Sequence, residues 1–312
     1  MIASHEELRD SEEVLYHLLL SYHDVNILID RKSSFLLDGG KVKQLSTGYK
    51  FTEGPVWDAS EGCLLFSDIP ANRIYRWTPG GSAKIFREPS GNSNGLTLDM
   101  SGNLITCEHG TRRIGKVDRD GNYTVIAETY GGRRLNSPND AVVKSDGSIY
   151  FTDPPYGITP EEQELLSQGV YRLEAEKKEP TLLVDDFERP NGLTFSPDEK
   201  TLYIADSSDR RHVRAFNVEN DGTLTDGRVF AEIRSELPGN PDGMKVDVEG
   251  NLYVATAGIW VFSEEGKHLG IIKIPEIPAN LAWGGKDWKT LYITARTSLY
   301  CVKTKVEGTY PV

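Results

Sequence analysis

Six polar residues recur along the chain, each just before a short apolar run: Glu53, Asn94, Asn139, Asn191, Asp242 and Asn280. An apolar residue that opens a second short run follows each of them 10 or 11 positions later. Segments such as Ser101-Gly102-Asn103 and Ser196-Pro197-Asp198 separate the two runs, and these residue types favour tight turns. The six side chains carry carboxylate and amide oxygens, which are the donors that hard divalent cations prefer.

A repeat of about 40 to 50 residues that is rich in short strands is typical of a β-propeller. Each repeat can be divided into four strand-like segments, and segments such as Val170-Tyr171-Arg172-Leu173 alternate apolar and polar residues. Equivalent positions in a propeller lie at equivalent places around its central axis. We therefore expect an all-β, six-bladed β-propeller in which the six polar side chains form a ring on the axis.

The sixth repeat has no clear outer strand before the chain ends at Val312. A strand-like segment at residues 41–45 precedes the first repeat, and we expect it to close the ring as the missing strand, which removes a free edge. The division is therefore a helical extension at residues 1–40 and a propeller at residues 41–312. An insertion at residues 153–168 contains Pro154-Pro155-Tyr156-Gly157; it either lines the channel mouth or is a surface excursion.

The ring contains two carboxylates, Glu53 and Asp242. At about 4 Å two such charges repel by roughly 4 kcal/mol at an effective dielectric of 20, and a divalent cation converts that cost into binding. We expect Ca²⁺, with Mg²⁺, Mn²⁺ or Zn²⁺ as substitutes, although the lack of histidine and cysteine at ring positions counts against zinc. A ring is wider than one coordination sphere, so Asn94 and Asn280 are expected to lie outside it.

A second, incomplete polar tier follows at the ends of the second strands: Asp68, Glu108, Asp153 and Asp206, with Thr256 and Ala295 in the last two repeats. We expect these acids to bind backbone N–H groups and loops. His109 follows Glu108, and either a structural or a catalytic role is open to it.

Composition narrows the functional classes. The net charge of −12 disfavours nucleic acid and anionic membranes as partners. No apolar run approaches the roughly 20 residues of a membrane span, and acidic residues before Leu18 are unlike the basic start of a secretory signal. Three widely spaced cysteines indicate buried thiols in a reducing compartment. We expect a cytoplasmic protein, and the sequence does not predict its oligomeric state.

Four motifs resemble those of the senescence-marker-protein/gluconolactonase/luciferin-regenerating-enzyme family. They are Glu53-Gly54-Pro55, Asn139-Asp140, Asn191-Gly192-Leu193 and Pro241-Asp242-Gly243-Met244. They occur in the family's order, and the resemblance covers residues 41–302. It implies a six-bladed propeller with a divalent cation, commonly Ca²⁺, in the central channel.

By this resemblance Glu53, Asn191 and Asp242 are metal ligands, Asn139 contacts metal or substrate, and Asp242 is also a general base. Mammalian members carry a sugar-binding arginine at the position of Ser137, so Arg134 could replace it only if the loop is rebuilt. The motif at 153–157 is similar to bacterial members. The candidate substrate contacts are Asn94, Asn139, Arg134, His109 and Tyr156.

The resemblance implies a metal-dependent hydrolase that opens a sugar lactone such as gluconolactone, with a small-molecule lactone as its partner. A phosphotriesterase that resembles diisopropyl fluorophosphatase would share the metal ligands. A non-catalytic calcium-binding propeller is an alternative of another class, although a scaffold needs no carboxylates on its axis. A strictosidine-synthase-like propeller would instead need a glutamate in an apolar pocket and no metal ring.

Overall fold

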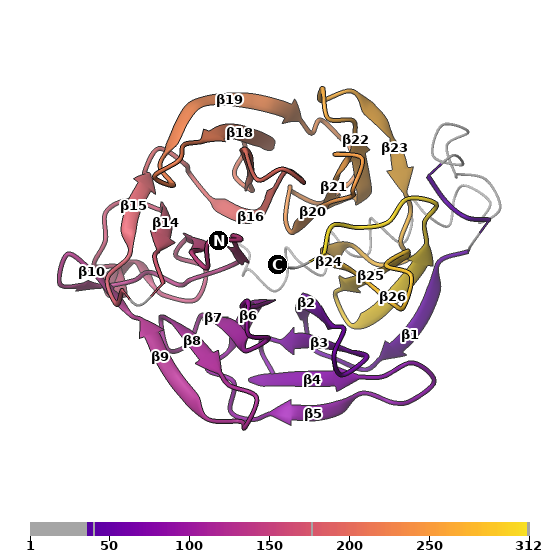
Figure 1. The fold of residues 1–312 in the computed structure, drawn as a ribbon, viewed down its shortest axis with the longest axis horizontal. Coiled ribbons are helices and arrows are strands. Elements are labelled where there is room, and N and C mark those ends of the chain that lie inside the picture. The colour runs from indigo at the N-terminus through magenta and orange to yellow at the C-terminus, as the bar shows by residue number, and fades with distance from the viewer. Residues whose placement is uncertain (1–35, 40, 176, 311–312) are drawn as a thin grey trace, which may run out of the picture.

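Six four-stranded antiparallel sheets surround a central channel in the computed structural model, which describes residues 36–39, 41–175 and 177–310 (Figure 1). This arrangement confirms the six-bladed propeller. The helical extension expected at residues 1–40 lies almost entirely outside the described residues. Among the described residues, none of the helices has the length and apolar composition of a membrane span.

The blades follow one another along the chain, and each runs from the channel outward. Blade 1 contains β2 (Thr52–Asp58), β3 (Cys63–Asp68), β4 (Arg73–Trp77) and β5 (Lys84–Arg87), and blade 2 contains β6 (Ser93–Leu98), β7 (Leu104–Glu108), β8 (Arg113–Val117) and β9 (Tyr123–Ala127). Blade 3 contains β12 (Ala141–Val143), β13 (Ile149–Asp153), β14 (Gly169–Leu173) and β15 (Thr181–Val184), and blade 4 contains β16 (Pro190–Phe195), β17 (Thr201–Asp206), β18 (His212–Val218) and β19 (Leu224–Glu232). Blade 5 contains β20 (Met244–Val246), β21 (Leu252–Thr256), β22 (Gly258–Phe262) and β23 (His268–Ile272).

Blade 6 joins both parts of the chain, as the sequence predicts. Its strands are β24 (Pro278–Gly284), β25 (Thr290–Ala295), β26 (Ser298–Lys303) and, on the outside, β1 (Lys43–Thr47). Strand β1 pairs antiparallel with β26, with Lys43 opposite Cys301 and Gln44 opposite Tyr300. The amide of Gln44 also donates to Ser298 Oγ at 3.0 Å. The closing strand therefore removes the edge that β26 would otherwise expose.

The core lies between the blades, because neighbouring sheets pack face to face. All residues of β3 are buried, which fits its unbroken apolar sequence at Leu64, Leu65 and Phe66. Burying one such side chain stabilises the fold by about 1.5–3 kcal/mol. At the seam between the first and last blades, the rings of Trp57 and Tyr292 stack with their centroids 5.3 Å apart.

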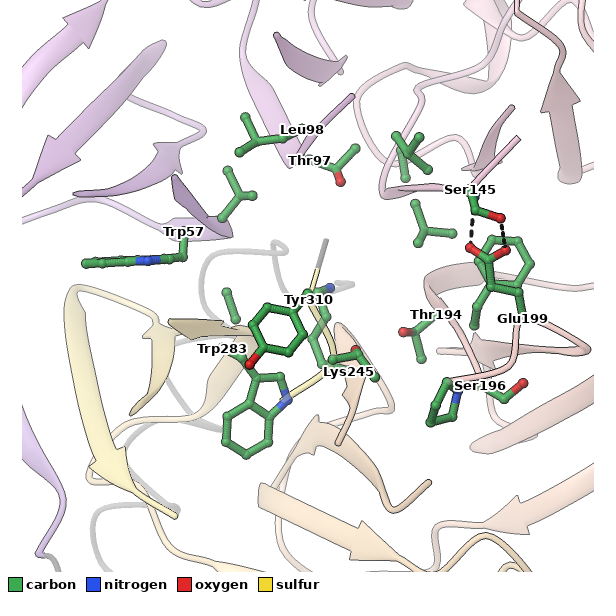
Figure 2. Close-up of a pocket in the computed structure, with 18 of the residues that line it drawn as sticks. Trp57, Thr97, Leu98, Ser145, Thr194, Ser196, Glu199, Lys245, Trp283 and Tyr310 are labelled. Carbon is green, nitrogen blue, oxygen red and sulfur yellow. Dashed lines mark hydrogen bonds between the residues drawn. The ribbon is translucent and has the colours of Figure 1, made fainter. Parts of the chain in front are cut away.

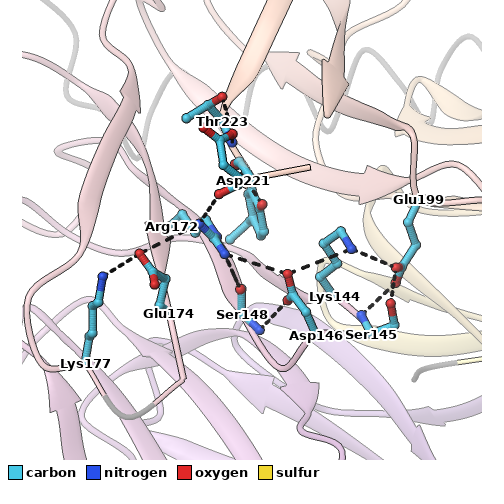
Figure 3. Close-up of polar contacts among 12 residues, drawn as sticks. Lys144, Ser145, Asp146, Ser148, Arg172, Glu174, Lys177, Glu199, Asp221 and Thr223 are labelled. Atoms are coloured by element: carbon cyan, nitrogen blue, oxygen red, sulfur yellow. Dashed lines mark hydrogen bonds and ion pairs between the residues drawn. The ribbon is translucent and has the colours of Figure 1, made fainter. Parts of the chain in front are cut away.

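Polar contacts join blades 3 and 4 beside the turns that end their innermost strands (Figure 3). Glu199 of blade 4 accepts hydrogen bonds from the backbone N–H of Ser145 at 2.8 Å and from Lys144 Nζ at 3.2 Å. Arg172 Nη1 donates to the carbonyl of Asp221 at 2.6 Å. These contacts connect blades 3 and 4 at this end of the channel.

Candidate functional site

The polar ring lies at the end of the channel where the innermost strands begin, which we call the ring end. Asn94 Nδ2 donates to Asn139 Oδ1 at 2.7 Å, and Asn139 Nδ2 donates in turn to Asn191 Oδ1 at 2.7 Å. Asn191 Nδ2 then donates to Ser207 Oγ at 2.9 Å. Three residues that lie far apart in the sequence are thus linked side chain to side chain around the axis.

The two ring carboxylates also lie close to one another. Burial raises the pKa of Glu53 well above its usual range, and the charges of Asp242 and Asp140 raise it further. The Asp242 carboxyl keeps some contact with solvent, yet protein atoms surround it; this desolvation, with repulsion from Asp140, raises its pKa to about 7. Uncompensated negative charge at this end of the channel therefore favours a cation.

Asp140 is a third channel carboxylate, which stands beside Asn139 in one of the four motifs but for which the sequence suggested no role of its own. It is buried, and this desolvation raises its pKa, while the ammonium of Lys245 opposes the shift. Asp140 Oδ1 accepts from the N–H of Ala141 at 2.9 Å, and Asp140 Oδ2 accepts from Asn280 Nδ2 at 3.3 Å. Its position follows directly after a ring residue, where blades 1, 2, 4 and 5 have glycine.

The ring position of blade 6 is Ala279, and Asn280 lies one residue further along. The N–H of Gly95 donates to Asn139 O and that of Gly243 donates to Ala279 O, both at 2.8 Å, so Ala279 is the counterpart of Asn139. The predicted ring position was wrong in this blade, because its first hairpin is longer. Trp283 pairs with Leu291 eight positions later in the sequence, whereas Trp57 pairs with Leu64 seven positions later. Asn280 therefore lies level with Asp140, which explains their contact.

Glycines after the ring residues let neighbouring blades approach the axis closely. A Cβ at Gly54 would lie 2.1 Å from the carbonyl oxygen of Asn94. A Cβ at Gly192 would lie 2.4 Å from the carbonyl oxygen of Asp242. Real Cβ atoms do not approach backbone so closely, so any larger residue would push two blades apart at the ring.

Three of the four acids in the second polar tier bind backbone N–H groups, as expected, and the fourth binds none within the described residues. Asp68 accepts from the N–H groups of Lys50 and Phe51, both at 3.1 Å. Asp153 accepts from the N–H groups of Asn136 and Ser137 at 2.7 and 2.8 Å. Each carboxylate thus fixes the segment that leads into an innermost strand. The two further acids are Asp206, which also accepts from backbone N–H groups, and Glu108, which pairs with arginine side chains.

His109 lies at the ring end, where its Nε2 is 3.2 Å from Asn94 Nδ2. Because the amide nitrogen can only donate, Nε2 accepts and the proton of the neutral ring sits on Nδ1. Burial lowers the pKa of His109 to about 4. The imidazole is therefore a neutral group that orients Asn94.

The insertion after β13 reaches the ring. Tyr156 is 39% exposed as a residue, yet its hydroxyl shares hydrogen bonds with Ser207 and Asn191. The N–H of Gly157 donates to Ser137 Oγ at 2.9 Å, so the loop also covers the position where mammalian relatives carry arginine. The insertion, which includes the 3₁₀ helix η2 (Pro160–Glu162), thus lines the mouth of the channel.

Arginines lie at different distances from the ring. Arg134 is exposed on the hairpin formed by β10 (Thr129–Tyr130) and β11 (Arg133–Arg134), where its Nη2 donates to Thr111 O at 3.1 Å. Arg296, between β25 and β26, lowers the pKa of Asp242 by its charge. The sequence offered no signal for Arg296, because no motif or repeat position marks it.

No group of three or more histidine, cysteine, aspartate or glutamate side chains in the described part of the chain has the arrangement of a metal site. The ring instead offers two carboxylates beside carboxamides. That donor set suits a hard cation, provided that the amides of Asn139 and Asn191 turn their oxygens toward it.

Comparisons with known proteins identify the family of this chain. A model of the SMP-30/Gluconolactonase/LRE-like region matches residues 51–297, and the chain belongs to this family. It is 35% identical over 294 residues to a gluconolactonase of Zymomonas mobilis, an alignment that covers 86% of this chain and 82% of the relative. A regucalcin of Xenopus laevis is 28% identical, with 80% and 85% covered. The structure of a gluconolactonase from Xanthomonas campestris superimposes with a TM-score of 0.81 at 33% identity, with 88% and 92% covered.

The close approach at the ring predicts different costs for two alanine substitutions. Gly54 and Gly62 both adopt left-handed backbone conformations, with φ of 52° and 60°, but a Cβ at Gly62 meets nothing within 4 Å. Gly54→Ala should therefore lower the free energy of unfolding by about 1–3 kcal/mol more than Gly62→Ala, as overpacking does. Urea denaturation of the two variants measures the difference. Equal losses would show that the blades do not depend on contact at Gly54.

Proposed function

We propose that the protein is a lactonase that opens a sugar lactone with the help of a divalent cation, with Ca²⁺ as the expected ion. The observation that carries this proposal is the meeting of Glu53 and Asp242 with the amides of Asn139 and Asn191 at one end of the channel. Membership of the family and the similarity to two gluconolactonases support it.

Glu53, Asn191 and Asp242, with Asn139, would hold the cation. Its two positive charges would balance the charges of Glu53 and Asp242. Burial raises both pKa values, and repulsion from Asp140 raises both further, with repulsion from Asp242 adding to the shift of Glu53. When bound, such an ion acts as a Lewis acid that polarises a carbonyl oxygen and stabilises the developing oxyanion.

Asp242 would accept the proton of the attacking water. Without a cation the pKa of this carboxyl is about 7, and a bound cation would lower it, so Asp242 would be ionised and able to accept a proton near neutral pH. The protonated carboxyl then passes this proton to the ring oxygen that leaves as the lactone opens. The products are a hydroxyl and a carboxylic acid, which ionises and releases a proton, so no organic cofactor is consumed.

Other side chains at the ring end would position the lactone hydroxyls. Asn94 and Asn139 offer amide groups, Tyr156 offers its hydroxyl, and neutral His109 holds Asn94 in place. The charge of Arg296 acts on Asp242, whereas no such effect is seen for Arg134. We therefore assign to Arg296 the contact with the lactone that the sequence suggested for Arg134. Arg134 could reach the lactone only if the β10–β11 hairpin moves.

A calcium-binding role without catalysis is a second candidate, because the chain also resembles regucalcin. Lactone assays separate the two. Assays with phosphotriesters, run beside them, test the phosphotriesterase alternative on the same protein.

Removal of the cation should abolish lactone hydrolysis. Treatment with excess EDTA leaves Glu53 and Asp242 without the ion that polarises the carbonyl, and added Ca²⁺ should restore the rate. A pH-indicator assay with δ-gluconolactone follows the acid that is released. Full activity of the metal-free protein would overturn the proposed mechanism.

Asp242→Asn should lower kcat at least about 10²-fold, because the substitution keeps the shape but removes the general base. Asn94→Ala is the matched change at the ring position expected to lie outside the metal's coordination, and it should cost far less. Calcium affinity should fall in Asp242→Asn too, since Glu53 alone cannot balance a divalent charge. Equal losses of kcat from both variants would indicate that the ring residues have a structural role and that Asp242 is not the catalytic base.

Calcium binding should release protons below neutral pH. The pKa of Asp242 is about 7 and that of Glu53 is raised well above its usual range, so both carry protons that a cation displaces. Affinity should therefore rise with pH and level off above the pKa of both groups. Calorimetry at pH 6 in two buffers of different ionisation enthalpy measures the release. Identical heats in both buffers would show that the carboxyls are already ionised.

A further inference from the structure

A second cavity lies at the other end of the channel, where the innermost strands of the blades end; we call this the far end. Its volume is about 410 Å³, within the roughly 300–1,000 Å³ of small-molecule pockets. Figure 2 shows side chains from several blades around one space, with Tyr310 of the C-terminal segment at its edge. Residues 308–309 tie this segment down, because Gly308 N donates to Trp288 O at 2.9 Å and Thr309 Oγ1 to Val246 O at 2.9 Å.

Lys245 gives this cavity a positive charge. It occupies the position in β20 three residues after Asp242, and it lines the far cavity. Its ammonium donates to the carbonyl of Met244 at 3.0 Å and forms no ion pair with any carboxylate of the described residues. The charge of Lys245 also lowers the pKa of Asp140, which lies toward the ring end. Two of the three N–H donors of Lys245 are thus open to a ligand.

Further hydrogen-bonding groups in the wall lack partners. The hydroxyls of Thr97 and Thr194, two equivalents of Lys245 in other blades, line the cavity and make no side-chain hydrogen bond within the described residues. Each hydroxyl can both donate to and accept from a ligand.

The acidic residues near the far cavity do not cancel this positive character. Glu199 accepts from Ser145 N and from Lys144 Nζ, so its charge is already paired. Asp198 accepts from Ser196 Oγ at 2.7 Å and from the N–H of Lys200. Lys245 is therefore the one lining charge without a close partner among the described residues.

We propose that the far cavity binds a small hydroxylated carboxylate. Lys245 Nζ would donate to the carboxylate, and Thr97 and Thr194 would exchange hydrogen bonds with hydroxyls of the ligand. The indoles of Trp57, Trp283 and Trp288 supply apolar walls for the carbon chain. The carboxylate class follows from the cavity alone, whereas the choice of a sugar acid among carboxylates rests on the proposed function.

The test is a fluorescence titration with D-gluconate in EDTA, so that no cation occupies the ring end. Three of the five tryptophans line the far cavity, so binding there should change the emission in a saturable way. Sorbitol has the same carbon number but no carboxylate, and it should bind at least about tenfold more weakly. Equal affinity for both would overturn the proposal, as would no saturable response to gluconate.

Variants locate the binding. Lys245→Met keeps the aliphatic stem and should weaken gluconate binding at least about tenfold, because a hydrogen bond to a charged group is lost. Lys84→Met makes the same change on an exposed side chain of β5, at the outer edge of blade 1, and it should bind like the parent. Lys245→Arg restores the charge and should recover most of the affinity, which also shows that the strand tolerates substitution. Unchanged binding by Lys245→Met would place gluconate elsewhere.

The two proposals fail separately. If the protein hydrolyses lactones but does not bind gluconate in EDTA, the proposed carboxylate site in the far cavity is overturned and the mechanism at the ring end stands. Gluconate binding that depends on Lys245, in a protein that hydrolyses no lactone, would leave the carboxylate site standing and overturn the proposed function.

Discussion

Like charges held close together in a closed channel are the constraint on which this structure depends. Glu53, Asp140 and Asp242 are brought together by strands from three different blades, and burial with mutual repulsion raises the pKa of Glu53 and of Asp242. A propeller can hold such a cluster because its blades are fixed by the cores between them and by the pairing of β1 with β26. A bound cation would relieve this repulsion, which is why the ring end is the place where we propose that a cation binds.

Close approach of the blades is the second requirement of the same site. Side-chain amides can join around the axis only if neighbouring backbones nearly touch, and glycine after the ring residue permits this. In blade 3 the position belongs to Asp140, and in blade 6 to Asn280. These two larger side chains form a hydrogen bond with one another, in which Asn280 Nδ2 donates to Asp140 Oδ2.

The spacing of the repeats predicted the fold, the closing strand and most of the ring. It could do so because strands alternate apolar and polar residues with a period of two, and hairpins of constant length place equivalent residues at constant spacing in the sequence. It failed at Asn280, because a hairpin longer by one residue shifts the phase and Ala279 offers no polar signal. The sequence also missed Arg296, and it gave Asp140 no role although a motif includes this residue, both for another reason. Their importance comes from charges that are neighbours in space and not in the sequence, and only the packed channel reveals them.

Strand β20 shows how one short strand can set opposite electrostatics at the two ends of the channel. Asp242 precedes it and faces the ring end, while Lys245 within it lines the far cavity. Asp140 interacts with both charges, since Asp242 is repelled by it and Lys245 attracts it. In a medium of low dielectric such interactions are stronger at any given distance. Asp140 therefore connects the two ends of the channel: loss of the Lys245 charge should raise the pKa of Asp140 further, and the charge of Asp140 in turn keeps the pKa of Asp242 raised.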